Sequence, residues 1–301
     1  MAEVILLDGG MGQELVTRHP GQKTGLWGTK VMLEAPETVV AVHSDYIAAG
    51  ATVITLNSYG LLHDRMERAG MLDQLGDLTR LACDLGQKAR DEAGVDVAIA
   101  GSLGPMGWSY RPDIAPPSDV AAPLYAELVA MQAPHVDLII GETVSSVDTA
   151  RGLLMGAQGC GKPIWLALSV DEKDGTLLRS GEDINDISPL LEEFDVDATL
   201  LNCSPPEAID AGLPVLEELG WTTGAYANGF TEITADFAQA SASVDLLTKR
   251  TDLGPDEYAK FACRWVDQGA RIVGGCCEVG PAHIARLKER LVEAGHTIRS
   301  L

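Results

Sequence analysis

The stretch "VDLIIGET", residues 136–143, shows the pattern that decides the fold of this chain. Its apolar residues are almost continuous, and the run ends in a glycine followed by two polar residues. A run of this kind is typical of a strand buried on both faces of a parallel sheet, with helices covering each face. The stretch therefore favours an α/β fold in which strands alternate with helices.

Seven further runs of the same kind are spread along the 301 residues. They are VILLDGG (4–10), ATVITLNSY (51–59), DVAIAGSLG (96–104), PIWLALSV (163–170), ATLLNCS (198–204), TTGAYANG (222–229) and ARIVGGCC (270–277). Helical patterns lie between them, at 36–50, 77–93, 121–134, 146–158, 187–194, 207–219, 255–270 and 281–295. Eight such units predict a (β/α)8 TIM barrel, formed as a single domain by residues 1–301. A doubly wound open sheet is the weaker alternative, because no G-x-G-x-x-G motif follows the first strand.

Composition limits the classes of partner. Hydrophobic residues make up 46% of the chain, and the formal net charge is −22. This charge argues against nucleic acid and against anionic membrane surfaces, because clustered Lys and Arg bind both. The N-terminus has no basic segment, its apolar run is too short for a signal peptide, and no stretch is long enough to span a membrane. We expect a cytoplasmic protein that acts on small molecules, and the sequence does not set its oligomeric state.

The active site of a (β/α)8 barrel forms at the carboxyl ends of the strands. Two features of these ends carry chemistry. Three cysteines fall on the sixth and eighth strands, and two carboxylates fall on the first and fourth. In chain order the ends read Asp8, Asn57, Ser102, Glu142, Ser169, Asn202, Cys203, Asn228, Cys276 and Cys277.

The cysteines Cys203, Cys276 and Cys277 would give zinc three thiolates and leave its fourth position open, as in a catalytic site. Their spacing, C-x72-C-C, is not a local zinc motif. Buried cysteines also serve as small apolar residues, so the pattern alone favours metal binding and core packing equally. A redox role for the neighbouring pair is less favoured, because adjacent cysteines close a strained ring. Gly274 and Gly275 would let the strand bend so that both sulfurs face one ion.

Zinc on three thiolates would hold an incoming thiol as thiolate, the nucleophilic form. A free thiol has a pKa of about 8.5 and is mostly protonated near neutrality. The chemistry suggested is attack by a substrate thiol on an alkyl group. Asp8 and Glu142 could bind a substrate ammonium, and the backbone amides of Gly9, Gly10 and Ser102 could bind a carboxylate. The alternatives are a tight turn after the first strand, a salt bridge of Glu142 inside the barrel mouth, and a phosphate loop, which would lack the Walker lysine.

Several longer motifs together resemble the homocysteine S-methyltransferase family over nearly the whole chain. They are "LDGGMGQEL" (7–15), "LWGTKVMLEAPETVVAVHSDYIAAGATVITLNSY" (26–59), "GSLGP" (101–105), "GET" (141–143), "LNCSPPE" (201–207) and "GGCCEVGPAHI" (274–284). The resemblance implies a (β/α)8 barrel with Zn2+ on Cys203, Cys276 and Cys277. It implies an enzyme that moves a methyl group from a sulfonium or ammonium donor, such as S-methylmethionine or betaine, to the thiol of homocysteine, giving methionine.

The resemblance also implies substrate contacts. Glu142 matches the position that binds the homocysteine ammonium, and Asp8 with Gly9 matches a substrate-binding turn. Ser102 and Asn202, at the ends of the third and sixth predicted strands, are further substrate-binding residues that we expect.

Trp27 and Tyr59 match aromatic positions near the methyl donor, where a cationic group favours π faces. Their alternatives are packing of a lid and packing of the barrel mouth. The chain also departs from the family pattern. Gln13 stands where the family usually has Thr, Glu278 stands where Gly-Thr or Arg-Thr commonly follows the cysteines, and "YANGF" (226–230) replaces the usual Tyr-Pro-Asn-x-Gly. These changes leave the donor and the acceptor open.

Two other functions remain alternatives. The chain could be a methyltransferase subunit that takes its methyl group from a folate or corrinoid system, which would require a partner protein because 301 residues leave no room for either domain. It could also be a barrel that binds zinc or a thiol without turnover.

Overall fold

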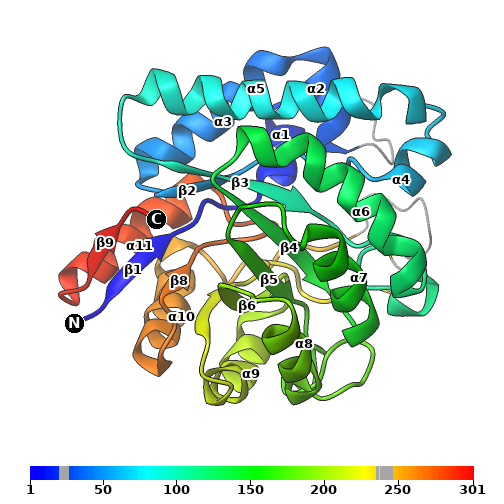
Figure 1. Cartoon of the computed structure of the whole chain (residues 1–301). Coiled ribbons are helices and arrows are strands. Elements are labelled where there is room, and N and C mark those ends of the chain that lie inside the picture. Colours follow the sequence, from blue (N-terminus) through cyan, green and yellow to red (C-terminus); the bar gives the residue numbers. More distant parts are fainter. Residues whose placement is uncertain (20–26, 235–236, 238–246) are drawn as a thin grey trace.

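The chain folds into a ring of parallel strands surrounded by helices (Figure 1). The computed structural model describes residues 1–19, 27–234, 237 and 247–301, so Leu26 of the second family motif lies outside the described residues. Hydrogen-bonded strands follow one another in the order β2-β3-β4-β5-β6-β7-β8-β1, and every pair is parallel. This order confirms the predicted (β/α)8 barrel. The strands are β1 (Glu3–Leu6), β2 (Val53–Thr55), β3 (Ala98–Leu103), β4 (Leu138–Val144), β5 (Ile164–Leu168), β6 (Ala198–Asn202), β7 (Thr222–Tyr226) and β8 (Ile272–Val273).

The ring closes between β1 and β2 through one parallel bridge, which pairs Leu7 with Val53. The Thr52 N–H donates to the Leu6 carbonyl at 2.7 Å, and the Asp8 N–H donates to the Val53 carbonyl at 3.1 Å. The closure therefore lies at the carboxyl end of β1, directly beside Asp8.

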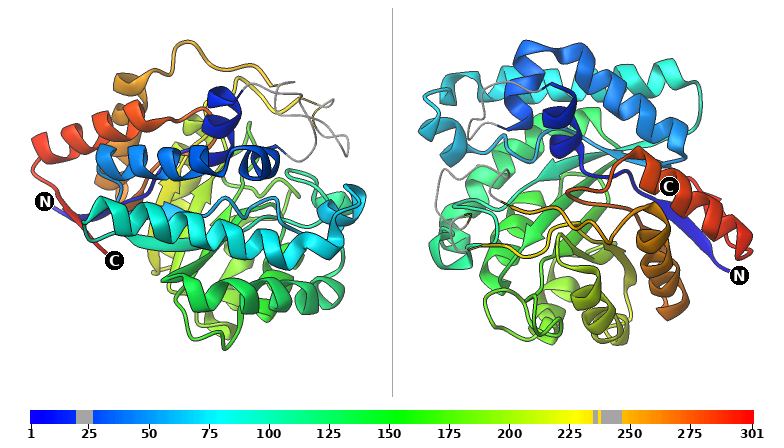
Figure 2. Two further views of the ribbon diagram at one scale, coloured as in Figure 1. Left: turned by 90° about the horizontal axis from the view of Figure 1, so that it is seen from above. Right: turned by 180° about the vertical axis from the view of Figure 1, so that it is seen from behind.

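A ninth strand, β9 (Thr297–Arg299), is present although the sequence pattern does not predict it. It pairs in parallel with the beginning of β1, where Glu3 lies opposite Thr297. Strand β2 pairs with β1 only at the carboxyl end of β1. Strand β9 therefore covers the rest of this edge of β1, which would otherwise lie open. The two ends of the chain consequently lie close together on one side of the barrel (Figure 2).

Within the described residues, each predicted helical range contains a helix. Pro36 begins one of them and Gly50, with φ 108°, ends it, as the sequence predicts. The helices are α3 (Pro36–Ala49), α5 (Leu75–Ala93), α6 (Ser118–Gln132), α7 (Val147–Ala157), α8 (Ser188–Glu193), α9 (Pro206–Glu218), α10 (Pro255–Gln268) and α11 (Pro281–Glu293). Short helices that were not predicted follow β1 and β2, namely α1 (Met11–Arg18), α2 (Gly28–Glu34) and α4 (His63–Arg68). None of the helices in the described ranges combines the length and the apolar character needed to cross a membrane.

Two apolar layers explain why the strand sequences are almost continuously hydrophobic. In β1 and just beyond it, Ile5 and Leu7 belong to the cluster inside the barrel, whereas Val4 and Leu6 belong to the cluster between strands and helices. Successive side chains of a strand point to opposite faces, so both faces of β1 are buried. A third, smaller cluster lies above the strands and includes Cys203 and Cys277.

Candidate functional site

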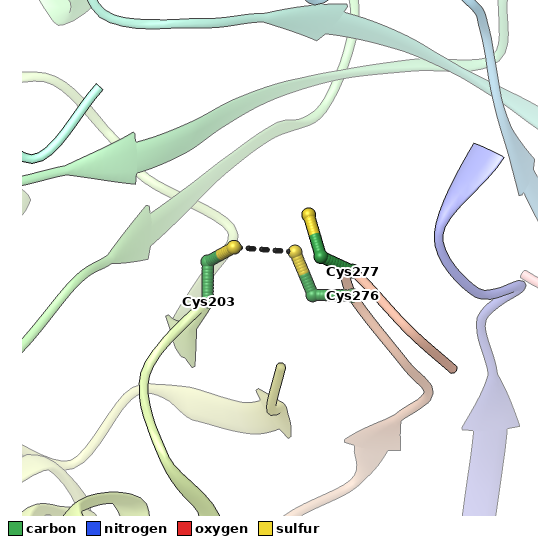
Figure 3. Close-up of side chains that lie close together, drawn as sticks. All are labelled: Cys203, Cys276 and Cys277. Atoms are coloured by element: carbon green, nitrogen blue, oxygen red, sulfur yellow. Dashed lines mark hydrogen bonds between the residues drawn. The ribbon is translucent and has the colours of Figure 1, made fainter. Parts of the chain in front are cut away.

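Three thiols converge at the mouth of the barrel. The sulfur atoms of Cys203, Cys276 and Cys277 all lie within 4.8 Å of one another. Cys276 Sγ donates a hydrogen bond to Cys203 Sγ at 2.7 Å, and the two segments approach from opposite sides (Figure 3). Cys203 and Cys277 are buried, and Cys276 is partly exposed. The structure thus brings together the three cysteines that the sequence places at strand ends.

The backbone turns at both segments to present these sulfurs. Cys203 follows the last residue of β6 and has φ 49°, a left-handed conformation that is uncommon outside glycine. Strand β8 ends at Val273, so Cys276 and Cys277 lie beyond the regular strand. A side chain at Gly274 would lie 2.4 Å from Leu7 Cβ, so this glycine is required by the close approach of the chain to Leu7.

The turn after the cysteine pair is made by a residue that the sequence analysis left unexplained. Among the described residues, the left-handed conformation near the pair falls on Glu278, with φ 65°, and not on Gly274 or Gly275. The Glu278 carboxylate forms an ion pair with Lys249 Nζ at 2.9 Å. Glu278 therefore fastens the cysteine segment to the crossover between β7 and α10.

The three thiols suit a thiophilic metal such as zinc. Tetrahedral zinc at about 2.3 Å from each sulfur sets neighbouring sulfurs about 3.8 Å apart, which is within the 4.8 Å limit that holds for all three sulfur separations of this cluster. Within the described residues no further His, Cys, Asp or Glu joins the group. The hydroxyl of Tyr110 lies 2.9 Å from Cys203 Sγ. Hydrogen bonds from Cys276, Cys277 and Tyr110 lower the pKa of Cys203, so Cys203 is the thiol that ionises first.

Asp8 is a buried carboxyl group that lines the same pocket as the three cysteines. It is 2% exposed and accepts hydrogen bonds from Thr55 N–H at 2.7 Å and from Thr55 Oγ1 at 2.8 Å. Burial raises the pKa of Asp8 to about 8, against the opposing effect of the two Thr55 bonds. The nearby Glu142 adds a smaller upward contribution. A cation placed beside Asp8 would relieve the cost of ionising it.

Glu142 is held by residues of two other strands. Ser102 Oγ donates to one carboxylate oxygen, and the Tyr226 hydroxyl donates to the other at 2.9 Å. Burial raises the pKa of Glu142 to about 7, the two hydrogen bonds oppose this shift, and the charge of Cys203 adds to it. Two carboxyl groups that both titrate near neutrality in one pocket form a receptor suited to an ammonium group.

A single pocket joins these groups. It is lined by the three cysteines and by most of the predicted substrate-binding residues, namely Asp8, Gly9, Trp27, Tyr59, Ser102 and Glu142. Asn202 is not among the lining residues. Its amide accepts from Thr143 N–H at 3.0 Å, so its contact in the structure is with the residue that follows Glu142.

The predicted role of two backbone amides is wrong. The Gly10 N–H donates to the Val279 carbonyl at 3.0 Å, and the Ser102 N–H donates to Ser58 Oγ at 3.2 Å. Neither amide is free for a substrate carboxylate. A side chain at Gly9 would lie 2.0 Å from the Val279 carbonyl oxygen, so this glycine is required by the packing of the turn.

The two predicted aromatic residues, Trp27 and Tyr59, differ in what their side chains contact. Trp27 has φ 46°, packs its indole on Gly12, and has a buried Nε1 without a hydrogen-bond partner in the described part of the chain. The Tyr59 hydroxyl lies 2.7 Å from Ser109 Oγ, and the guanidinium of Arg65 lies over its ring at 5.1 Å.

Residues that the sequence analysis missed hold the functional groups in place. Thr55 orients Asp8, Tyr226 orients Glu142, and Tyr110 contacts Cys203. In the altered YANGF turn, Asn228 Nδ2 donates to the Cys203 carbonyl at 2.8 Å. Asn228 is one of the strand ends read from the sequence, and Tyr226 stands two residues before it, so the strand pattern could have indicated Tyr226 as well. Tyr110 lies in a proline-rich loop without periodic pattern.

The fold and the site define a class of protein, a (β/α)8 barrel with a metal-type thiol cluster at its mouth. A family model described as homocysteine S-methyltransferase matches residues 5–291. The chain therefore belongs to the homocysteine S-methyltransferase family and is a methyltransferase, which confirms the resemblance seen in its motifs.

Individual relatives match over almost their whole length. Homocysteine S-methyltransferase of Escherichia coli is 28% identical, over 96% of this chain and 95% of its own. YbgG of Bacillus subtilis, a homocysteine S-methyltransferase, is 26% identical over 94% and 93%, and the selenocysteine methyltransferase of Astragalus bisulcatus is 26% identical over 92% and 89%. The metallated form of the E. coli homocysteine methyltransferase MmuM superposes with a TM-score of 0.80, at 27% identity and 96% coverage of both chains.

Proposed function

We propose that this chain is a zinc-dependent S-methyltransferase that moves a methyl group from a sulfonium or ammonium donor to homocysteine, giving methionine. The observation that carries the proposal is the convergence of Cys203, Cys276 and Cys277 in a pocket that also contains Asp8 and Glu142. Thiolates are the ligands that zinc takes in sulfur-rich tetrahedral sites. The names of the relatives support homocysteine as the acceptor.

Cys203, Cys276 and Cys277 would hold the metal, and the remaining position would be open to the substrate. Zinc bound there supplies Lewis acidity that keeps a substrate thiol deprotonated near neutral pH. The chain itself binds and orients the amino acid. Asp8 and Glu142 receive its ammonium, and Ser102 and Tyr226 hold the Glu142 carboxylate in a fixed position.

The reaction itself is a displacement at the methyl carbon. The thiolate sulfur of homocysteine forms the new S–CH3 bond while the C–S or C–N bond of the donor breaks. The electron pair of that bond leaves with the donor, which loses its positive charge. The residues of the pocket serve by holding the two substrates in line and by excluding water.

Purified full-length protein, with its zinc content measured, tests the proposal. It is incubated with homocysteine and a panel containing S-methylmethionine, betaine and trimethylsulfonium, and methionine is measured by mass spectrometry. We expect methionine from at least one donor. Zinc-loaded protein that methylates neither homocysteine nor selenocysteine with any donor contradicts the proposal and favours a binding barrel without turnover. Activity that appears only after a corrinoid or methylfolate protein is added favours the partner-dependent alternative.

A further inference from the structure

Arg65, in α4, holds a guanidinium group at the pocket in a fixed orientation. Its Cζ lies 5.1 Å from the centroid of the Tyr59 ring and 5.3 Å from that of the Trp108 ring. Its Nη2 donates to the Pro105 carbonyl at 3.3 Å and to Ser109 Oγ at 3.2 Å. Stacking of this kind covers the faces of a guanidinium and leaves its edge available for hydrogen bonds.

The charge of Arg65 has no counterion in the described part of the chain. No acidic side chain there forms an ion pair with it, its Nε is buried without a hydrogen-bond partner, and its Nη1 has none. Arg68 provides the contrast one helical turn away. It also lies over Trp108, at 5.7 Å, but it is paired with Asp64 at 2.9 Å. Partly buried cations are usually paired, so the missing partner of Arg65 points to a ligand.

Arg65 is also chemically unlike the rest of the pocket. Among the described lining residues it is the only Lys or Arg, and the same pocket contains two carboxyl groups and three thiols. An anionic group on a substrate would therefore find one cationic partner here. Two substrate carboxylates are available for it, that of homocysteine and that of the methyl donor.

The position of Arg65 favours the donor. Homocysteine carries its carboxylate and its ammonium on one carbon, so its carboxylate must stay near Asp8 and Glu142. The two carboxyl groups are held by Thr55, Ser102 and Tyr226. Arg65 instead contacts a separate set of residues, namely Tyr59, Trp108, Pro105 and Ser109. The Tyr59 hydroxyl lies 2.7 Å from Ser109 Oγ, and the hydroxyl of Tyr110, the next residue, lies 2.9 Å from Cys203 Sγ, so the segment beside Arg65 leads to the thiols.

We propose that Arg65 binds a carboxylate of the methyl donor, so that the enzyme selects onium donors that carry an acidic group over those that do not. The inference rests on the proposed function, because it assigns a place to the second substrate of that reaction. A zwitterionic donor fits both ends of the site, with its onium methyl toward the thiols and its carboxylate on the guanidinium. A purely cationic donor would meet an uncompensated positive charge.

Donors that differ in one group provide the test. S-methylmethionine and betaine carry a carboxylate, and trimethylsulfonium and tetramethylammonium do not. In Arg65→Met, kcat/KM for the carboxylate donors should fall about 30-fold, which corresponds to about 2 kcal/mol for hydrogen bonds to a charged group. For the other cations it should change less than about threefold. Arg65→Lys, which keeps the charge but not the stacked planar group, should lose less than Arg65→Met. Arg68→Met is the matched control and should leave all donors unaffected.

Calorimetry separates this inference from the proposed function. The Kd of homocysteine should be the same in wild type and Arg65→Met, and the Kd of betaine or S-methylmethionine should weaken about 30-fold. An equal loss with every donor, no loss with any donor, or a weakened homocysteine Kd overturns the inference. If the wild type transfers no methyl group, the proposed function fails, and the carboxylate-donor Kd of the two proteins still decides the role of Arg65. Circular dichroism of each variant confirms that it is folded.

Discussion

The mouth of this barrel has two halves that are built in different ways. The thiol half stands on strand ends and consists of Asp8, Glu142, Cys203, Cys276 and Cys277. The aromatic half stands on segments that follow β2 and β3 and consists of Tyr59, Arg65, Trp108 and Tyr110. Groups of the thiol half are held by hydrogen bonds from neighbouring strands, as Thr55 holds Asp8 and Tyr226 holds Glu142. Groups of the aromatic half are held by ring and cation stacking.

This difference indicates which half of the mouth performs the chemistry and which half selects the methyl donor. Strand ends are fixed by the closed ring, so the thiol half has little freedom to change without loss of the reaction. Loops can change residue by residue while the barrel stays intact, and function on barrels of this kind varies mostly through them. We therefore assign activation of the thiol to the first half and choice of the donor to the second.

Removing one sulfur should give the largest effect. In Cys276→Ser, zinc content measured by mass spectrometry should drop, and methionine formation should fall by more than about 100-fold, beyond the range for residues that only support a metal ligand. Cys160→Ser is the matched control, because Cys160 is a partly exposed cysteine outside the cluster. A Cys276→Ser protein that keeps both zinc and activity would remove the distinction between the halves.

Neutralising one carboxylate should weaken binding of the acceptor. In Glu142→Gln, the Kd of homocysteine measured by calorimetry should rise at least about 30-fold, because a buried charged partner of the ammonium is lost. The KM of the donor should stay nearly constant. If only the KM of the donor changed, Glu142 would act on the donor, and its assignment to the thiol half would be wrong.

Tyr110 is where the two halves meet, since its loop belongs to the aromatic half and its hydroxyl contacts Cys203. In Tyr110→Phe, affinity for zinc, measured by competition with a chelator, should fall about tenfold, the lower range for a supporting partner of a metal ligand. An unchanged zinc affinity would mean that the halves act independently.

Asp8 predicts a pH dependence of stability. Its pKa is raised from 3.8 to about 8 by burial, so folding favours the protonated form. The stability contributed by this group is fully present below the ordinary pKa and is lost as the pH rises through about 8. In the absence of homocysteine, the Tm of the wild type should fall as the pH rises from 3.8 to about 8. The Tm of Asp8→Asn should fall less, because the Asn side chain stays neutral. Parallel Tm profiles for the two proteins would show that Asp8 does not titrate there.

The smallest effect is expected at Glu278. Its partner Lys249 is 59% exposed, so the ion pair contributes no more than about 1 kcal/mol. In Glu278→Gln, Tm should drop by a few degrees at most, and kcat/KM should change less than about threefold. A large change in activity would give Glu278 a direct part in the chemistry of the thiol half.

The thiol half could be predicted from the sequence because barrel geometry does the placement. Once eight strands are recognised, Cys203 and Cys276 are expected at the same rim of the barrel although 72 residues separate them. The predicted contacts of the Gly10 and Ser102 amides were wrong because the partners of these amides could not be seen in the sequence. The acceptors that occupy Gly10 and Ser102, namely Val279 and Ser58, come from distant segments that no local pattern connects.

The aromatic half was largely hidden from sequence reasoning. Tyr59 was predicted from the family resemblance, but Arg65 and Tyr110 lie in a short helix and a proline-rich loop. Their importance depends on stacking and on a left-handed backbone angle at Tyr110 of φ 64°, neither of which leaves a periodic signal. Strand β9 was not predicted, because the reason for it is the edge of β1 that would otherwise be unpaired, and this edge is visible only in the folded barrel.

X-ray absorption at the zinc edge tests the central claim most directly, that the three cysteines hold a zinc ion whose open position receives the thiol of homocysteine. We predict three sulfur neighbours at about 2.3 Å in the protein alone and four after homocysteine is added. A sulfur count that does not change with homocysteine, or a shell made mainly of nitrogen and oxygen, would contradict it.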